Sequence, residues 1–254
     1  MILIKNFEKK GYVKINNVFS KREIKKVNVA MYDSLLTFIN DKSKSKVTKK
    51  FTMNKFQKLM NYAYYKRKKI FQKLYDFAQN QITLYELCSN QKLLKLISKI
   101  LKVKQSSLIV GDLTLRIDNP GISSAALDYH QESTYYPEVK NYSKSILIWI
   151  PLHEIKKNGG GLSVCSKFFS KKYKTKWDGR QAIVDPKMLK RLSNDYTFVG
   201  KEGSILACNF NLFHASSINK SSEFRFSCAF RFFSSEAKKF FPFRKFRRNQ
   251  LAKV

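Results

Sequence analysis

Histidine is scarce in this chain of 254 residues, which contains only His130, His153 and His214. Glycine (9) and proline (5) are also few, which excludes collagen-like and proline-rich linker sequences. The four cysteines lie far apart and form no C-x-x-C pair, so the sequence encodes neither a local thiolate zinc site nor a redox motif. The starting segment MILIKNFEKK has too short an apolar run for a signal peptide, and no apolar run in the sequence approaches the roughly 18 residues of a membrane span. We therefore expect a cytoplasmic protein in a reducing compartment.

Acidic residues are few as well: 18 Asp and Glu stand against 50 Lys and Arg, a net charge of +32. Such an excess is typical of proteins that bind nucleic acid or acidic membranes. Here, however, 40 of the cations are lysine and only 10 are arginine, whereas groove and phosphate recognition favours the bidentate arginine fork. The abundance of Ile, Asn, Phe and Tyr points to a genome-wide compositional bias. The charge alone does not identify a partner.

The hydrophobic content of 43% is sufficient for one sizeable core, so we expect a single domain over residues 1–254. The first hundred residues predict a strand at 12–15, a helix capped by Ser20, a polar loop at 41–50 and helical structure at 84–101. After residue 106 the pattern changes to short β-type runs separated by turn residues. These runs are SLIVGDLTLRI, SILIWIPL, GLSVC, GSILACNF and FRFSCAFRFF.

Helical patterns do not alternate with these strands, which argues against a parallel doubly wound sheet. We expect an α+β, mostly β protein: an antiparallel sandwich or jelly roll over 106–235, supported by helices in 1–105. Residues 236–254 form a basic tail with interleaved phenylalanines. This tail is interpreted either as an anchor for an anionic surface or as a segment that docks on the barrel.

Two of the three histidines are candidate metal ligands, although an isolated H-x-E pair such as His130 and Glu132 is also typical of an ordinary polar loop. His130 and Glu132 are two residues apart, so on an extended chain their side chains project from the same face. His214 follows an apolar run that could return to this pair within a rolled sheet. Two histidines and one carboxylate leave the opposite coordination positions open, as in non-haem Fe(II) oxygenases. His153 is expected to have a structural or surface role.

A predicted strand shortly after His214 carries a candidate anion-binding residue. Alternation places Arg225 on one face with small residues, and the phenylalanines on the other. We expect the aromatic face to pack on the helices and the arginine face to line the barrel interior. Arg225 could hold a carboxylate there, and Ser216 could donate a second hydrogen bond to it.

Several blocks of the chain resemble the phytanoyl-CoA dioxygenase family of Fe(II)- and 2-oxoglutarate-dependent oxygenases. These blocks are GYVKINNVFSKREI, LYELCSNQKLLKLISKIL, HQESTYYPEVKNYSKSILIWIPLHEIKKNGGGLSV and FHASSINKSSEFRFSCAFRF. The resemblance implies a double-stranded β-helix (a cupin-like jelly roll) with N-terminal helices packed on one sheet.

The resemblance also implies roles for six residues. His130, Glu132 and His214 match the metal ligands, whereas Arg225, Ser216 and Gln131 match residues that bind or border the 2-oxoglutarate cosubstrate. Two features depart from the family pattern. The carboxylate ligand is usually Asp rather than Glu, and the usual Pro-Gly-Ser-His turn is replaced by CSKFF at 165–169. The longer glutamate could shift the position of the metal, and the altered turn is expected to reshape the entrance to the active site.

The expected reaction is hydroxylation of an unactivated carbon of a small molecule by Fe(II), 2-oxoglutarate and O2, with release of succinate and CO2. Tyr135, Tyr136, Trp149 and Arg116 are candidate substrate contacts. An anionic substrate could also be attracted by a cationic cluster comprising Lys171, Lys172, Lys174, Lys176 and Arg180. The alternative is a non-catalytic basic jelly-roll protein that binds nucleic acid or an anionic membrane surface.

Overall fold

The structure, a computed structural model, describes residues 2–40, 50–122, 126–136, 142–165, 167–178, 181–192 and 196–237. The expected loop at 41–50 (except Lys50), Arg180 and residues 238–254 of the expected tail lie outside this set. The helices are α1 (Ile2–Lys10), α2 (Lys21–Asn40), α3 (Met53–Lys66), α4 (Lys68–Ala78), α5 (Ile82–Cys88), α6 (Gln91–Leu101) and α7 (Pro186–Leu189), with 3-10 turns η1 (Gln105–Ser107), η2 (Glu132–Thr134) and η3 (Tyr142–Lys144). The strands are β1 (Tyr12–Ile15), β2 (Leu108–Asp118), β3 (Ser145–Pro151), β4 (Leu162–Val164), β5 (Thr175–Trp177), β6 (Ala182–Val184), β7 (Tyr196–Phe198), β8 (Ile205–Asn209), β9 (His214–Ser216) and β10 (Arg225–Ser234).

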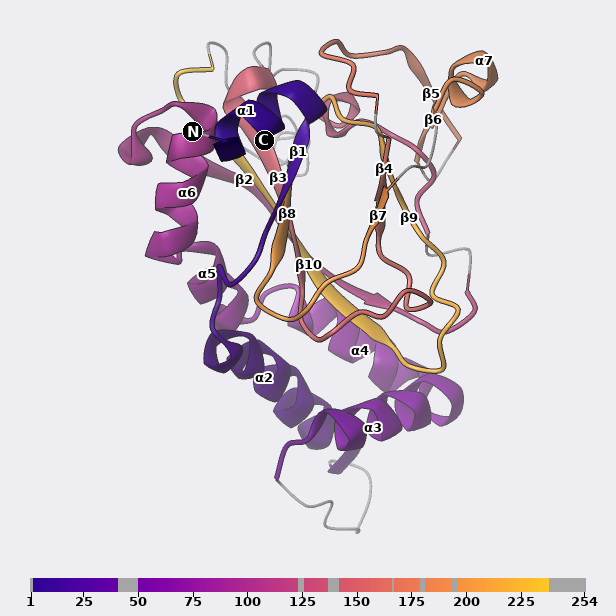
Figure 1. Ribbon diagram of the computed structural model, residues 1–254. Helices are drawn as coiled ribbons and strands as arrows, with labels where there is room; N and C mark the ends of the chain where they lie inside the picture. Colours follow the sequence, from indigo (N-terminus) through magenta and orange to yellow (C-terminus); the bar gives the residue numbers. More distant parts are fainter. Residues whose placement is uncertain are drawn as a thin grey trace, which may run out of the picture.

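The strands form antiparallel sheets, which confirms the mixed α and antiparallel β class expected from the sequence. A five-stranded sheet has the order β1-β8-β3-β10-β2, and a three-stranded sheet has the order β7-β4-β9 (Figure 1). Strands β5 and β6 form a separate hairpin beside α7. The N-terminal strand β1 pairs with β8, so the first residues of the chain complete the edge of the large sheet.

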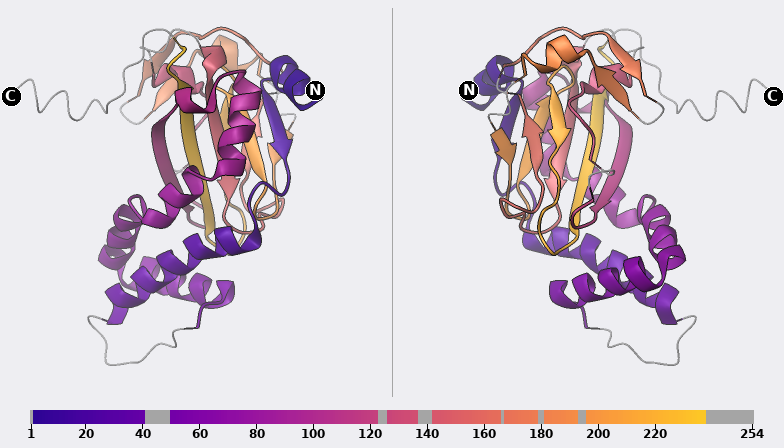
Figure 2. Two further views of the ribbon diagram at one scale, coloured as in Figure 1. Left: turned by 90° about the vertical axis from the view of Figure 1, so that its left-hand side faces the viewer. Right: turned by 90° about the vertical axis from the view of Figure 1, so that its right-hand side faces the viewer.

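Helices α1–α6 pack on one side of the five-stranded sheet, and the three-stranded sheet covers its other face; the opposite views of Figure 2 show the two layers. The core beneath the helices contains Phe224, which precedes β10, and the alternate residues of β10 from Phe226 to Phe232. Phe226 stacks on Phe56 of α3, with ring centroids 4.7 Å apart. The aromatic face of this strand therefore packs on the helices, as its alternation predicts. Among the residues described, no helix combines the length and apolar character needed to cross a membrane.

A second hydrophobic cluster joins the two sheets. Trp149 of β3 packs edge-on against Phe198 of β7, with centroids 5.5 Å apart, and Leu162 of β4 belongs to the same cluster. We call the face of the five-stranded sheet that points toward this cluster the inner face. On β10 the inner face carries Arg225, Ser227, Ala229 and Arg231, because these positions alternate with the phenylalanines.

The buried amide of Gln57 on α3 fixes the start of β10. Its Nε2 donates to the carbonyl oxygen of Phe224, and its Oε1 accepts from the backbone N–H of the same residue, both at 2.8 Å. The Gln57 amide therefore satisfies both backbone polar groups of Phe224, the residue before β10. The helical layer thereby positions the neighbouring Arg225.

The predicted helical segment 84–101 is two helices, α5 and α6, rather than one. The break occurs at Asn90, whose Oδ1 accepts from the backbone N–H groups of Lys92 and Leu93 at 2.9 and 3.1 Å. Asn is among the preferred N-cap residues because its side chain satisfies such N–H groups. Ser20 caps α2 as expected, in a reciprocal pair with Glu23.

We expect Asn90→Ala to lower the free energy of unfolding by about 1–2 kcal/mol, because the first turn of α6 loses its cap. The variant also loses the 2.5 Å hydrogen bond from Asn90 Nδ2 to Glu23 Oε1, which links α6 to α2. Urea unfolding followed by circular dichroism measures the change. Asn90→Ser, which retains a capping oxygen, is expected to recover most of the loss; equal stability of the Ala variant and the native protein would contradict the cap.

Candidate metal centre

His130 and His214 are brought together by a backbone bridge between their segments. The N–H of His130 donates to the carbonyl of His214 at 3.0 Å, and the reverse bond measures 3.1 Å. The two ring centroids lie 4.3 Å apart. The strand return expected from the sequence therefore places both imidazoles side by side.

Each imidazole is oriented by the carbonyl two residues before it. His130 Nδ1 lies 2.7 Å from the Asp128 oxygen, and His214 Nδ1 lies 3.0 Å from the Leu212 oxygen. A carbonyl can only accept, so Nδ1 carries a proton, and in the neutral tautomer Nε2 has the lone pair that can bind a metal. Burial, followed by the proximity of His214, lowers the pKa of His130 to about 3. Neutral imidazoles with a fixed tautomer are the form in which histidine binds metals.

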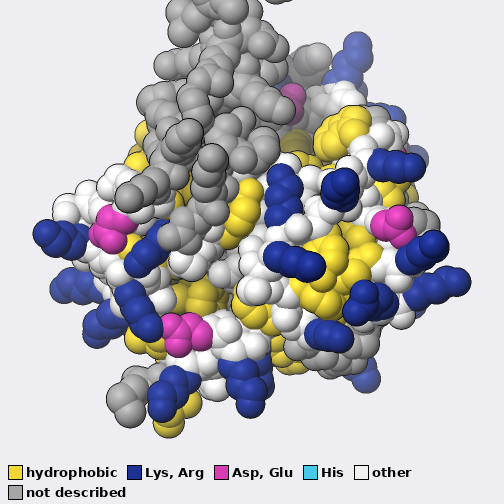
Figure 3. Space-filling model, turned by 90° about the horizontal axis from the view of Figure 1, so that it is seen from above, with side chains coloured by type: hydrophobic (Ala, Val, Ile, Leu, Met, Phe, Trp, Pro, Cys, Tyr) yellow, Lys and Arg dark blue, Asp and Glu magenta, His cyan; other side chains and the backbone are white. Residues whose placement is uncertain are grey.

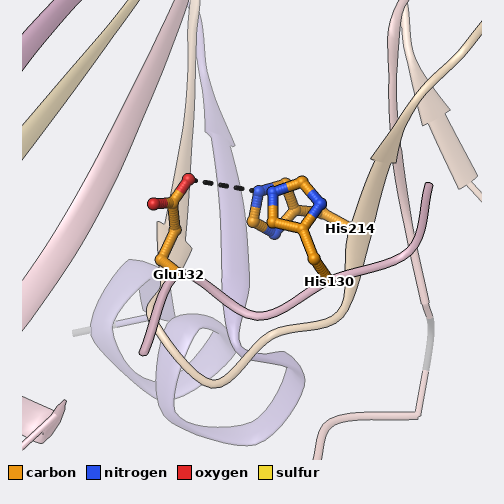
Figure 4. A group of neighbouring side chains, drawn as sticks. All are labelled: His130, Glu132 and His214. Carbon is orange, nitrogen blue, oxygen red and sulfur yellow. Dashed lines mark ion pairs between the residues drawn. The ribbon is translucent and has the colours of Figure 1, made fainter. Parts of the chain in front are cut away.

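Glu132 completes a group of three buried side chains whose ligand atoms all lie within 4.8 Å of one another. Its Oε1 is 3.4 Å from His214 Nε2, and Figure 4 shows the carboxylate on η2 directed toward the two rings. Two ligands about 2.1 Å from a common ion are separated by roughly 3.0–3.4 Å when they are adjacent. The side chains therefore have the types and spacing of a two-histidine, one-carboxylate metal centre.

Arg231, which the sequence analysis did not single out, holds the other side of this carboxylate. Its Nε donates to Glu132 Oε2 at 2.8 Å, and its Nη2 donates to Oε1 at 3.0 Å. Burial opposes ionisation of Glu132, but Arg231, together with His214, outweighs burial and keeps the pKa of the carboxyl well below its usual range. The alternation that placed Arg225 on the inner face also places Arg231 there, three inner-face positions further along β10.

Arg225 is buried at the start of β10. It pairs with a carboxylate as expected, but this carboxylate is the side chain of Asp118. Arg225 Nη2 lies 2.5 Å from Asp118 Oδ2, and Asp118 Oδ1 also accepts from Arg116 at 2.9 Å. The guanidinium lies 5.9 Å from the ring centroid of Trp149. Asp118 faces Arg225 directly in the antiparallel register of β2 and β10. The sequence alone does not identify this acid as the partner of Arg225, because only the pairing of the two strands brings the two residues together.

The glycine-rich turn between β3 and β4 supplies further acceptors for Arg225. Nη1 donates to the carbonyl oxygens of Gly160 and, at 3.4 Å, of Gly161. Gly160 has φ +73°, and a Cβ there would lie 2.7 Å from the Ser217 oxygen. The turn therefore needs glycine to bring its backbone close to the arginine.

Two polar atoms at this end of the inner face have no hydrogen-bond partner among the residues described. They are Arg225 Nε and Ser227 Oγ, and both side chains are at least 97% buried, with exposures of 3% and 0%. Ser216 lies nearby on β9, two residues after His214. Its neighbour Ser217 donates to the Gly161 carbonyl, which Arg225 also approaches. Ser216 remains a predicted cosubstrate contact.

Gln131, between the two ligands of its segment, is fully buried and bound to backbone groups at both ends of its amide. Nε2 donates to the carbonyls of Lys171 and Asn211 at 2.9 and 2.7 Å, and Oε1 accepts from the Tyr173 N–H at 2.8 Å. These bonds attach the lysine-bearing segment after β4 to the metal-binding segment. The expected contact of Gln131 with a cosubstrate stays a prediction.

The remaining candidate residues lie at different distances from the centre. The ring of Tyr135 is 5.6 Å from that of His130, and its hydroxyl accepts from the Ala182 N–H at 3.3 Å. Tyr136 packs instead on Phe210 and Phe233 in the cluster between the sheets. Trp149 and Arg116 border Arg225, as described above.

His153 lies outside the three-residue group, and its Nε2 accepts from the Phe226 N–H at 3.2 Å. This bond is consistent with the structural role expected of it. Four exposed lysines of the expected cationic cluster, Lys171, Lys172, Lys174 and Lys176, lie before and on β5. Lys and Arg side chains surround the end of the molecule viewed from above in Figure 3, whereas few acidic side chains are visible on it.

Known structures share this fold. The epimerase SnoN in complex with Fe3+, alpha ketoglutarate and nogalamycin RO aligns with a TM-score of 0.62 and 11% identity, covering 96% of this chain and 92% of SnoN. EvdO2 from Micromonospora carbonacea var. aurantiaca, complexed with 2-oxoglutarate, gives 0.59 and 14%, covering 92% and 90%. The non-heme monooxygenase ThoJ, in a nickel complex, gives 0.58 and 16%, covering 91% and 77%. These identities are low, so the likeness concerns the fold.

The sequence matches one family model but no curated protein. The family model described as phytanoyl-CoA dioxygenase (PhyH) matches residues 7–227, a range that includes every ligand of the candidate centre together with Arg225. The chain therefore belongs to the phytanoyl-CoA dioxygenase family.

Proposed function

We propose that this protein is an Fe(II)- and 2-oxoglutarate-dependent oxygenase that hydroxylates an unactivated carbon of a small molecule. The main support is the buried convergence of His130, Glu132 and His214. This donor set leaves adjacent coordination positions open and is typical of non-haem Fe(II) oxygenases. SnoN and EvdO2, which were solved with the oxo acid, provide a precedent on a similar fold. In this proposal the two sheets constitute a double-stranded β-helix.

The residues of the centre fit an Fe(II) ion. The two Nε2 lone pairs and Glu132 Oε1 would hold it, because the Nδ1 atoms are already engaged by backbone carbonyls. The bound ion would supply the activation of dioxygen. The protein keeps His130 neutral and the carboxylate of Glu132 ionised, and the burial of all three side chains excludes water from their surroundings.

The inner face near Arg225 fits the distal carboxylate of 2-oxoglutarate. Arg225 Nε and Ser227 Oγ are buried donors without a partner among the described residues. Arg116, Asp118 and Arg225 together carry a net charge of +1, so one further carboxylate would neutralise the group. A buried guanidinium is stabilised by such pairing. Ser216 would add a hydroxyl from the facing sheet.

For the substrate we propose a small molecule that enters beside Tyr135. This side chain is the candidate substrate contact that lies against a metal-ligand ring. It also contacts Trp177 of β5, whose exposed fraction is 64%, at a centroid distance of 6.5 Å. An aromatic path therefore leads from the surface to His130. The lysines near β5 favour an anionic substrate.

Release of succinate tests the proposed activity. The protein is incubated with Fe(II), 2-oxoglutarate and oxygen, with and without candidate substrates, beside samples that contain a chelator. Succinate formation that requires Fe(II) is the expected result. Metal binding without any succinate above the chelated control would contradict the oxygenase and favour the non-catalytic alternative.

We expect Arg225→Ala to raise the KM for 2-oxoglutarate by about 10- to 100-fold, because a hydrogen bond to a charged group contributes roughly 1.5–3 kcal/mol. Asp118 keeps Arg116 as its partner in this variant, so the ion pair is not abolished. Succinate release at varied cosubstrate concentration measures the effect. Lys95→Ala removes an exposed cation on α6 and serves as the control. An unchanged KM in the Arg225 variant would contradict the assigned role.

A further inference from the structure

The bidentate pair between Arg231 and Glu132 is built into the inner face. Arg231 comes from β10, whereas Glu132 comes from η2, and the side-chain exposures are 16% and 2%. Both carboxylate oxygens accept from the guanidinium, at 2.8 and 3.0 Å. Two parallel N–H donors fix the plane of a carboxylate as well as its position.

This pairing leaves the metal-facing side of Glu132 available. Each carboxylate oxygen has about two lone-pair sites, and the guanidinium takes one on each. Oε1 is at the same time 3.4 Å from His214 Nε2. The carboxylate thus occupies a ligating position while it is held by Arg231.

The arrangement also accounts for the glutamate at a position where the family usually has aspartate. The additional methylene lets one carboxylate, starting from η2, reach Arg231 on β10 and the edge of the histidine pair together. The longer arm has more rotamers, so it needs an additional constraint to stay in place. Arg231 supplies that constraint.

The charge of the arginine does not leave the centre positive. Arg231 Nη1 lies 3.6 Å from Asp112 Oδ2 and donates to Thr114 Oγ1 at 3.1 Å, both on β2. Arg231, Glu132 and Asp112 together carry a net charge of −1. A divalent cation therefore still meets a negative group, although a guanidinium lies behind the ligand.

We infer that Arg231 is a positioning residue of the metal centre, holding Glu132 in the orientation in which it binds the ion. This inference shares one assumption with the proposed function, namely that His130, Glu132 and His214 bind a divalent metal ion. Partners that orient metal ligands typically change metal affinity by 10- to 100-fold. Arg231 is not expected to touch the ion itself.

Cobalt(II) binding tests the role without relying on turnover. Titration calorimetry gives the affinity, and the visible absorption of bound Co(II) reports its ligand set. We expect Arg231→Leu to weaken Co(II) binding about 10- to 100-fold and to change the absorption spectrum. Arg231→Lys keeps the charge but not the bidentate fork, so a partial loss is expected. Arg22→Leu, which removes an exposed arginine on α2, is the control expected to bind Co(II) as the native protein does.

A double-mutant cycle separates positioning from a general effect on folding. Glu132→Gln should cost much affinity in the native background and little in the Arg231→Leu background, because the carboxylate is already displaced there. Additive losses, or native affinity and spectrum in Arg231→Lys and Arg231→Leu, would overturn the inference. If the native protein itself binds no Co(II), the proposed function fails instead. Should the Leu variant not fold, the Lys variant decides, since it retains a counter-charge for Glu132.

Discussion

Replacing His214 by Ala is expected to weaken divalent-metal binding by at least about 100-fold and to reduce succinate release to the chelated background. The reason is geometric: His214 Nε2 lies 3.4 Å from Glu132 Oε1, and its ring centroid lies 4.3 Å from that of His130, so its loss removes one of the three converging ligands. Removing a direct ligand costs more than the 10- to 100-fold that is typical of outer partners. Calorimetry with Co(II) and the succinate assay measure the two effects.

The third histidine of the chain provides the matched control. His153 accepts a backbone hydrogen bond from Phe226 and is not a member of the candidate centre. His153→Gln keeps an acceptor and should bind Co(II) with native affinity. Native-like metal binding by the His214 variant would remove the basis of the proposed centre, as would an equal loss in both variants.

The second large effect concerns stability: Asp118→Ala should lower the free energy of unfolding by about 3–5 kcal/mol. Removing one partner of a buried ion pair leaves an uncompensated buried charge. Here the substitution deprives Arg225, which is 3% exposed, and Arg116 of their shared acid. Chemical denaturation measures the change. Glu86→Ala breaks the exposed Lys26–Glu86 pair and should cost at most about 1 kcal/mol.

The pH dependence of stability distinguishes the charge of Asp118 from its shape. Burial opposes ionisation of this carboxyl, but Arg225 and Arg116 outweigh burial, so its pKa is lower in the folded than in the unfolded protein. The stabilisation is thus present above the unfolded value, about 3.9, and is lost as the pH falls through the folded value. Asp118→Asn, of similar shape, should lack this part of the acid dependence. The same acid dependence in both proteins would show that Asp118 contributes no charge-linked stability.

Much of the fold was predictable because local patterns agree with it. The alternation of β10 identified both of its faces, and Ser20 marked the start of α2. The division of 84–101 into α5 and α6 was not predicted, although the polar residues 89–92 interrupt the apolar spacing at the point where Asn90 caps α6. The order of the strands in the sheets depends on pairings between distant segments, which periodicity does not contain.

The parts of the candidate site that could be predicted are those that follow from the small number of histidines and from the alternation of side chains along a strand. With three histidines in the chain, few metal-binding combinations were open, and His130 and His214 do meet. The acid opposite Arg225 was not found because Asp118 becomes its neighbour only through the register of β2 and β10. Arg231 could have been found by extending the inner-face series by one position. The environment of Gln131 depends on a loop whose path has no sequence signal.

The positions of Arg225, Arg231 and the core phenylalanines all depend on the number of residues that separate them along β10. Arg225 and Arg231 occupy the inner face, and the phenylalanines between them fill the helical core. Because side chains alternate, inserting or deleting one residue between the arginines would exchange the two faces over part of the strand. Guanidinium groups would then enter the aromatic core while phenyl rings replaced them beside the metal ligands. Length changes in this strand should therefore be far less tolerated during evolution than substitutions.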